Sequence, residues 1–419
     1  MKGGIYMIIF LRKICFKKSV HIYVSVVLAV TLFGGIMLFP ETNILAKENL
    51  KMYAKSYALT DGDTNRVLVG ENENVPMANA STTKILTCIL TLENCSLDDE
   101  VIVSKNAALQ PKVRLGMQEG ERYPLKDMLY GLMLESYNDC AVAIAEHVAG
   151  SEAAFAEMLN QKAALLGCQD TYFITPNGLD REDENGFHHT TAVDLCKMMS
   201  YCVWESAKKD DFLEITQTRS FAGNANGKNY SFSNKNAFLD QMEGVLSGKT
   251  GYTAKAGYCY VAAYENNGER YCISLLACGW PNNKTYKWSD SRTLFTYGVN
   301  NYDKKRIVLD EIKKEYEIEG YVVPPEFLSI NSNGNLILYG EEKLYEVLLN
   351  ESEQVKKEVE IYEKIEVPIS EGQVLGKCKI YIENVLLDEV ELVAMKDVKA
   401  WNMPDILKVI LCQFLTFSS

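Results

Sequence analysis

The chain has 419 residues, enough for two domains, and its composition, 47% hydrophobic and 24% charged, is that of a globular protein. Its net charge is −13, and because residues 1–46 hold five basic residues and one acidic residue, the remainder carries −17. This acidic balance argues against a nucleic-acid partner, which would require basic patches.

Residues 1–46 have the features of an export signal. A positive region is supplied by four basic side chains, Arg12, Lys13, Lys17 and Lys18, and an apolar run follows from Ile22 to Phe39. Ala46 marks a cleavage site, although Ile44 fits the small-residue cleavage pattern poorly, and the run is long enough to stay in a membrane. We therefore expect a signal peptide or a signal anchor, with the rest of the chain outside the cytoplasm.

The first folded elements predicted are a hairpin and a buried helix. Two strand-like runs, Ser56–Thr60 and Arg66–Val69, flank a turn at Asp61-Gly62-Asp63. Ala80–Glu93 is apolar on nearly every face, which is typical of a helix buried in a core. Ser81-Thr82-Thr83-Lys84 lies at its start, where positions three apart share a face, so that the Lys84 amine can approach the Ser81 hydroxyl.

Four further helices are predicted in the middle of the chain. The first, Leu125–Glu135, ends at Ser136-Tyr137-Asn138, and the second covers Asp139–Val148. The third is capped by Ser151 and ends near Leu166. A turn-rich loop over Thr175–Asp180 leads to the fourth, which begins at Thr190 or Thr191.

Strands dominate the next stretch. Val245–Tyr252 is predicted to be a strand that carries Lys249-Thr250-Gly251, and Tyr258–Tyr264 and Tyr271–Cys278 form a hairpin around Asn266-Asn267-Gly268. A helix is predicted over Ser289–Val299. Helices inserted between the strands of one antiparallel sheet indicate an α+β fold.

After Tyr302 the pattern changes. Charged, alternating segments such as Glu358–Val367 and Lys377–Val385 predict a second, β-rich domain over residues 304–396. Trp401–Phe417 predicts an amphipathic helix that begins near Pro404 and is too short to cross a bilayer. Residues 397–419 either lie in the membrane interface or dock on the second domain, and we expect the membrane.

The spacing of the 12 cysteines does not indicate a disulfide framework. Five of them fall inside apolar segments, where a thiol packs as a small hydrophobic group: Cys88, Cys140, Cys196, Cys272 and Cys278. The sequence has no C-x-x-C pair, and the adjacent His188 and His189 have no flanking cysteine pair. We therefore expect no metal site and no cofactor.

Three short motifs point to nucleophilic catalysis. Ser81-Thr82-Thr83-Lys84, Ser136-Tyr137-Asn138 and Lys249-Thr250-Gly251 occur in that order with wide spacing. A serine attacks a carbonyl only when a neighbour accepts its proton, and none of the four histidines is next to Ser81 in sequence, so Lys84 is the predicted base. These motifs together are those of penicillin-binding proteins and class A β-lactamases. A second S-x-x-K sequence, Ser206–Lys209, is predicted to be a solvated helix end.

From about Tyr53 to Tyr302 the chain resembles the low-molecular-mass penicillin-binding proteins that are serine-type D-alanyl-D-alanine carboxypeptidases. The resemblance includes the flanks of the motifs: Met77–Lys84, Thr175–Leu179 with His188, and Gly244–Thr253. It implies a β-lactamase/transpeptidase-like domain over residues 50–303, with an antiparallel sheet, helices on both faces and a helical subdomain. The residues after Tyr302 resemble, more loosely, the C-terminal β domain and amphipathic anchor of these proteins.

The resemblance also implies a substrate and a location. The substrate would be a peptidoglycan stem peptide that ends in D-Ala-D-Ala, β-lactam antibiotics would inhibit the enzyme, and the protein would be attached to the outer face of the plasma membrane. Ser81 would form an acyl-enzyme, Lys84 would act as a base with a lowered pKa, and Ser136 would pass a proton to the leaving amine.

Substrate-binding roles follow from the same resemblance. Asn138 would hold Lys84 and the substrate amide, and the backbone N–H groups of Ser81 and Tyr252 would form the oxyanion hole. Lys249 and Thr250, followed by Gly251, would meet the terminal carboxylate. Near the position of Lys287, the family usually has an arginine that helps bind this carboxylate. A lysine cannot form the two parallel hydrogen bonds of a guanidinium group, so we expect a different substrate affinity. Tyr137 is bulkier than the residue usual in the family, which affects the expected pocket shape.

Rival interpretations remain open at this point. A class A β-lactamase needs a carboxylate on the loop before the third motif, and Thr175–His188 has four acidic residues without the E-x-x-L-N arrangement. A catalytically inactive wall-binding scaffold would lack a motif residue, and none is missing. Endopeptidase activity on cross-links stays possible. His188 is either catalytic or orders its loop, and we expect the second.

Overall fold

The computed structural model describes residues 50–310, 312–317, 335–362, 365 and 368–398, together with 404, 407 and 411. The predictions for residues 1–46 and for most of residues 397–419 lie outside the described residues. Within the described residues, no helix is long and apolar enough to span a membrane.

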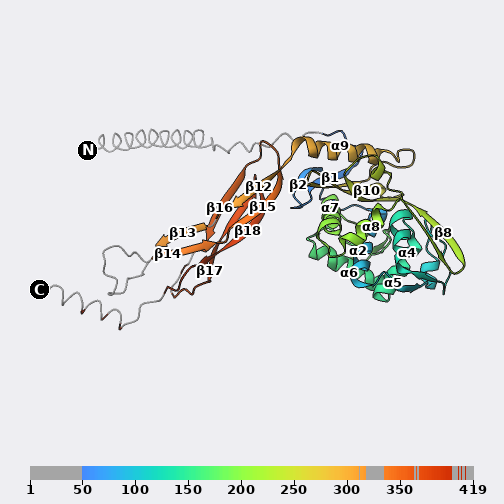
Figure 1. The fold of residues 1–419 in the computed structure, drawn as a ribbon, viewed down its shortest axis with the longest axis horizontal. Coiled ribbons are helices and arrows are strands. Elements are labelled where there is room, and N and C mark those ends of the chain that lie inside the picture. The colour runs from blue at the N-terminus through green and yellow to red at the C-terminus, as the bar shows by residue number, and fades with distance from the viewer. Residues whose placement is uncertain are drawn as a thin grey trace, which may run out of the picture. The chain divides into compact units, whose positions relative to one another are not determined.

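Five antiparallel strands form the central sheet (Figure 1). The two predicted hairpins supply four of them, and the edge strand β9 carries Lys249-Thr250-Gly251. Asn267 and Gly268 join β10 to β11 with φ values of 52° and 83°, which a two-residue type I′ turn requires. The order across the sheet is β2 (Val67–Glu71), β1 (Ser56–Asp61), β11 (Glu269–Leu276), β10 (Gly257–Asn266) and β9 (Val245–Thr253).

Helices cover both faces of this sheet, as predicted for the α+β fold. α9 (Tyr286–Asn301) packs on one face, and α7 (Ala192–Ser200) with α8 (Lys209–Gln217) lies on the other (Figure 1). The remaining helical elements form the subdomain between β2 and β9: η1 (Ala80–Thr83), α2 (Lys84–Asn94), α3 (Lys105–Ala108), α4 (Leu125–Tyr130), η2 (Gly131–Glu135), α5 (Asn138–Ala149), α6 (Glu152–Leu165), η3 (Tyr201–Glu205) and η4 (Ala237–Asp240).

Three small two-stranded antiparallel sheets also occur in this domain. They are β3 (Glu100–Ile102) with β4 (Arg122–Pro124), β5 (Glu182–Asp183) with β6 (Gly186–Phe187), and β7 (Ser220–Ala225) with β8 (Lys228–Ser233). The last two pairs are hairpins, whereas α3 lies between β3 and β4 in the chain.

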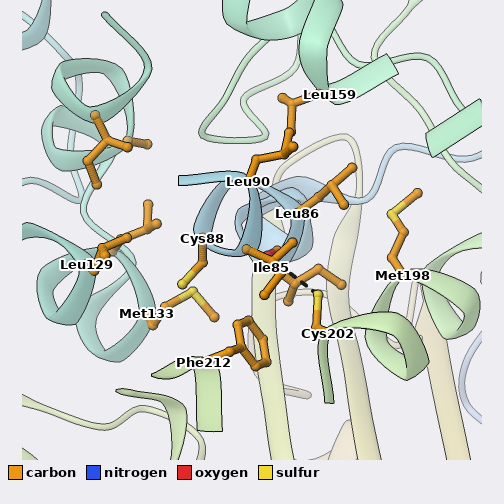
Figure 2. Packing of buried hydrophobic residues seen from close by; sticks show 14 of the residues in the cluster. Ile85, Leu86, Cys88, Leu90, Leu129, Met133, Leu159, Met198, Cys202 and Phe212 are labelled. Atoms are coloured by element: carbon orange, nitrogen blue, oxygen red, sulfur yellow. Dashed lines mark hydrogen bonds between the residues drawn. The ribbon is translucent and has the colours of Figure 1, made fainter. Parts of the chain in front are cut away.

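The helix α2 lies at the centre of the core. Its residues from Lys84 to Leu92 are all buried, as its apolar sequence predicted. Figure 2 shows side chains of α4, η2, α6, α7, η3 and α8 surrounding it, among them Leu129, Met133, Leu159, Met198 and Phe212. A buried leucine contributes about 1.5–3 kcal/mol to stability, so this packing holds the start of α2, and Ser81 just before it, in a fixed position.

Helix ends follow the predicted capping residues. The Ser151 hydroxyl accepts a hydrogen bond from Ala154 N–H at 3.1 Å and caps α6. Thr191, not Thr190, caps α7 by accepting from Asp194 N–H at 3.0 Å. The prediction of a solvated helix end at Ser206 is wrong for the serine itself, because its side chain is buried and donates to Glu93 Oε1 at 2.7 Å.

The β-rich segment after α9 forms two sheets. β12 (Asp303–Leu309) pairs with β15 (Lys343–Leu349). The other sheet has the order β13 (Ile312–Glu317), β14 (Asn335–Gly340), β18 (Val385–Ala394), β17 (Val374–Ile382) and β16 (Val355–Ile361). Its alternating sequence gives a separate apolar core that includes Leu338, Ile380 and Leu392.

The cysteines behave as the sequence predicted. All ten in the described part of the chain are free thiols, and nine of them are buried. Burial raises the thiol pKa of Cys168 to about 12 and that of Cys259 to about 12, which keeps them protonated and unreactive.

Candidate active site

The fold brings the three motifs to one place. Ser81 lies in η1, Ser136 follows η2, and Lys249 to Gly251 lie on β9, which packs against η1. Glycine is required at position 251, because a Cβ there would lie 2.9 Å from Asn79 O and 3.0 Å from Ser81 N. The K-T-G strand can therefore pass directly beside the backbone of Ser81.

Lys84 is fully buried and its amine contacts three oxygen atoms. Lys84 Nζ lies 2.8 Å from Ser81 Oγ, 3.0 Å from Asn138 Oδ1 and 2.7 Å from the carbonyl oxygen of Asn177. Asn138 Nδ2 donates to Pro111 O at 3.2 Å, which fixes Oδ1 as the atom that faces Lys84. The Asn138 side-chain oxygen and the Asn177 backbone oxygen can only accept hydrogen bonds.

This geometry orients the lysine lone pair. A neutral amine has two N–H donors and one lone pair, so donation to the Asn138 and Asn177 oxygens leaves the lone pair for the Ser81 hydroxyl proton. Burial lowers the pKa of Lys84 well below its ordinary value, and the positive charge of Lys249 acts in the same direction. Lys84 is thus suited to accept a proton at neutral pH.

Ser136 and Lys249 form a second pair. Lys249 Nζ donates to Ser136 Oγ at 2.9 Å and to the carbonyl of Thr250 at 2.9 Å. Ser136 has a φ of 67°, a left-handed conformation that costs a non-glycine residue about 1–3 kcal/mol. Burial lowers the pKa of Lys249 to about 7.

A cavity of about 410 Å³ opens in front of these groups. Ser81, Ser136, Asn138, Thr250, Gly251, Tyr252 and Lys287 all line it. Lys84 and Lys249 are buried behind this surface, 0% and 2% exposed. A ligand in the cavity therefore meets the Thr250 and Ser136 side chains, with the Lys249 charge one layer behind.

Lys287 lies on the cavity wall, and its amine is placed over aromatic rings. Its Nζ is 4.8 Å from the ring centre of Tyr258 and 4.4 Å from that of Trp288, and it donates to the carbonyl of Lys284. Burial lowers the pKa of Lys287 to about 8. Tyr137, in contrast, packs edge-on against Phe232, with 5.5 Å between the ring centres, and is not among the residues that line the cavity.

The contact of the Asn177 carbonyl oxygen with Lys84 was not predicted from the sequence. A backbone oxygen has no signature in residue type, and only the turn sequence Thr175–Leu179 indicated an ordered loop. His188 holds this loop: its Nδ1 accepts from Ile174 N–H at 3.0 Å, and its Nε2 lies 2.9 Å from Thr83 Oγ1. Burial lowers the pKa of His188 to about 3, so the ring is neutral and orders the loop rather than titrating.

Comparison with known proteins identifies the family. The sequence model of D-alanyl-D-alanine carboxypeptidases matches residues 43–277, more than half of the chain. The chain belongs to the D-alanyl-D-alanine carboxypeptidase family. The sequence model of the C-terminal domain of penicillin-binding protein 5 matches residues 336–400, in the β-rich segment. The predicted family, fold class and serine-type carboxypeptidase activity are thereby confirmed.

Individual relatives agree with this assignment. The carboxypeptidase DacF of Bacillus subtilis is 28% identical over 387 residues, which cover 88% of this chain and 94% of DacF. The crystal structure of DacD from Francisella tularensis covers 87% of this chain and all of its own, with a TM-score of 0.64 at 20% identity. Penicillin-binding protein D2 of Listeria monocytogenes, solved in a cefotaxime-bound form, covers 60% of this chain and 99% of its own, with a TM-score of 0.53 at 24% identity.

Gly178 should be essential for the carboxypeptidase site. Its φ is +80°, and a Cβ would lie 2.0 Å from Ala80 O and 3.0 Å from Ser81 N, so Gly178→Ala must push the Asn177 loop away from the nucleophile. A displacement of about 1 Å costs on the order of 100-fold in rate, and we expect at least this loss in D-Ala release.

Gly167→Ala is the matched control for backbone strain. Gly167 has a similar φ of +71°, and a Cβ at this position would meet no atom within 4 Å, so its variant should lose only the melting temperature that backbone strain costs and should keep its activity. Equal activity of the two variants would show that contact between Gly178 and η1 is unimportant.

The pH profile of the carboxypeptidase should depend on Lys249. Because its pKa is about 7, its positive charge is present below that pH and is lost above it, and kcat/KM should fall on the alkaline side. Lys249→Arg keeps the charge, so the fall should move to higher pH. Lys235→Arg, on the same cavity wall but with a 57% exposed side chain, should leave the profile unchanged. An unmoved alkaline limb in Lys249→Arg would assign the titration to another group.

Proposed function

We propose that this enzyme removes the terminal D-Ala from peptidoglycan stem pentapeptides through an acyl-enzyme on Ser81. The observation that carries the proposal is the 2.8 Å contact between Ser81 Oγ and a buried lysine whose other acceptors are two carbonyl oxygens. Only the hydroxyl can supply a proton to the lone pair of that amine. We also propose that β-lactams acylate the same serine.

Acylation begins when Lys84 takes the Ser81 proton. Serine Oγ then attacks the carbonyl of the penultimate D-Ala, and the oxyanion that forms is held by the backbone N–H groups of Ser81 and Tyr252. Gly251 supports this arrangement, because the absence of a side chain lets β9 approach Ser81 N. Asn138, on the cavity wall, holds both Lys84 and the substrate amide.

The enzyme recognises the C-terminal end of the peptide by its free carboxylate. Thr250 offers a hydroxyl in the cavity, and the Lys249 ammonium behind it adds a positive charge, with Lys287 as a second cation on the wall. Ser136 relays a proton to the leaving D-Ala amine: its hydroxyl hydrogen, left available because its Oγ accepts from Lys249, goes to the nitrogen. The proton that Lys84 took from Ser81 replaces it, so Lys84 is neutral again when water attacks the acyl-enzyme. Water then releases the shortened peptide.

Slow release of bound penicillin is part of the proposal. The loop between the second and third motifs has four acidic residues, Asp180, Glu182, Asp183 and Glu184, and all are exposed. Glu135 is the acidic residue that lines the cavity, and it is paired with Lys235 at 3.1 Å. A class A β-lactamase needs a carboxylate beside the nucleophile to activate water. Because the four loop acids are exposed and Glu135 is paired with Lys235, the β-lactamase alternative is disfavoured. The cefotaxime-bound Listeria relative supports acylation by β-lactams.

The proposed location is the outer face of the plasma membrane. The export-signal features of residues 1–46 support translocation, and the amphipathic sequence of residues 397–419 supports attachment. In that segment Pro404, Leu407 and Leu411 are helical, and the two leucines are 53% and 59% exposed. Positions 407 and 411 share a helix face, which is the arrangement an interfacial helix needs.

Removal of the Ser81 hydroxyl should abolish the reaction. Incubation with a diacyl-Lys-D-Ala-D-Ala peptide and an assay of free D-Ala should give at least about 10³-fold lower activity for Ser81→Ala, because a nucleophile and its base act as a unit. Labelling with fluorescent penicillin should be lost in parallel. Ser206→Ala, which alters the other S-x-x-K sequence, should keep both activities, since Ser206 contacts Glu93 and not the site.

Three results would contradict this proposal. An intact acyl adduct that maps to a hydroxyl other than Ser81 would reject the mechanism. Rapid, repeated nitrocefin hydrolysis by the purified enzyme would favour a β-lactamase, and a folded protein that neither labels with penicillin nor releases D-Ala would favour an inactive scaffold.

Membrane attachment should depend on the two exposed leucines. In a protein without residues 1–46, Leu407→Asp with Leu411→Asp should abolish co-sedimentation with phosphatidylglycerol–phosphatidylethanolamine vesicles, because buried apolar area drives interfacial binding. Leu344→Asp with Val385→Asp is the matched control, since these exposed residues, 60% and 52%, lie on β15 and β18. Vesicle binding that survives the first pair of changes would contradict attachment through this segment.

A further inference from the structure

A cluster of three metal-ligand side chains lies outside the active site. The Cys95 thiol, an Asp99 carboxylate oxygen and a ring nitrogen of His147 all lie within 4.8 Å of one another. Cys95 is also the one cysteine among the ten in the described residues that is not buried. The cluster is therefore open to an ion from solution.

The spacing of two of these atoms suits a shared ion better than a hydrogen bond. His147 Nε2 lies 3.4 Å from Asp99 Oδ2, which is longer than the usual N–H···O range of about 2.7–3.2 Å. Two ligands bound at about 2.0 Å to one tetrahedral zinc ion lie roughly 3.3 Å apart. The thiol lies within 4.8 Å of both atoms, and a sulfur and an oxygen or nitrogen bound to one zinc ion lie roughly 3.5 Å apart, so a small rotation of the Cys95 side chain would bring its sulfur to the ion.

The three ligands are held by rigid elements. Cys95 is the C-cap of α2, and its N–H donates to Thr91 O at 3.0 Å. His147 is in the last turn of α5, which packs against α2. Asp99 is fixed between them in a turn, because its carbonyl oxygen accepts from Leu125 N–H at 2.8 Å.

We propose that Cys95, Asp99 and His147 bind a thiophilic divalent transition metal, with Zn²⁺ as the preferred ion. A thiolate, an imidazole and a carboxylate are the ligands that Zn²⁺ takes in four-coordinate sites, and water would occupy the fourth position. On binding, the Cys95 thiol loses its proton to solvent and the sulfur forms the metal bond.

The site would join the far ends of two helices that carry catalytic groups. α2 begins at Lys84 and α5 begins at Asn138, whereas Cys95 and His147 lie at their opposite ends. An 11-residue helix is about 16 Å long, so the ion would stand apart from Ser81 and would tie the two helices together rather than take part in the reaction. Metal binding here is independent of the proposed function.

Cobalt is the direct probe of this site. Titration of the reduced full-length protein with Co²⁺ should give a near-ultraviolet band from sulfur-to-cobalt charge transfer and the visible bands of a tetrahedral ion, and Zn²⁺ should remove both. Cys95→Ser should lose the charge-transfer band, and Cys95→Ser, Asp99→Asn and His147→Ala should each weaken Zn²⁺ binding by at least about 100-fold, since loss of an outer-shell partner already costs up to that much.

Asp98→Asn is the matched control. Asp98 is an exposed acid next to Asp99 and outside the cluster, so its variant should bind both ions as the unaltered protein does. Absence of a charge-transfer band in the unaltered protein, or its persistence in Cys95→Ser, would overturn the proposal and leave His147 and Asp99 as an ion pair only. Absorbance and metal affinity are read without substrate, so this failure is distinguishable from failure of the carboxypeptidase mechanism.

Discussion

A fully buried amine at Lys84 is the constraint on which the rest of the site depends. An ammonium ion in a dry core is costly unless it is paired, and this amine has a hydroxyl and two carbonyl oxygens as its hydrogen-bond partners rather than a carboxylate. The amine is therefore driven toward its neutral form. The same burial that opposes its charge makes this amine able to act as a base toward the Ser81 hydroxyl.

The fold positions that base from three directions. α2 supplies the lysine from the centre of the core, α5 supplies Asn138 from its first residue, and the loop held by His188 supplies the Asn177 carbonyl. Each support is anchored by buried contacts rather than by exposed side chains. This matters because proton transfer requires atoms placed within a few tenths of an ångström.

The site also retains unfavourable local features. Ala80 and Ser136 both adopt left-handed backbone conformations, with φ values of 50° and 67°; Ala80 precedes Ser81, and Ser136 is itself one of the proposed catalytic residues. Lys249 is a second buried lysine behind the cavity wall. Such features cost stability and persist only where the surrounding packing is strong, which the apolar environment of α2 in Figure 2 provides.

The sequence alone determined the three motifs, the fold class and most elements, because S-x-x-K on an apolar helix and K-T-G on a strand are local patterns. It could not place the Asn177 carbonyl or the cluster of Cys95, Asp99 and His147, since a backbone oxygen has no residue signature and Asp99 and His147 are 48 positions apart. The structure also decided that Tyr137 packs inward and that Ser206 is buried. Those outcomes depend on which surfaces meet when helices and sheet pack, and only long-range contacts determine that.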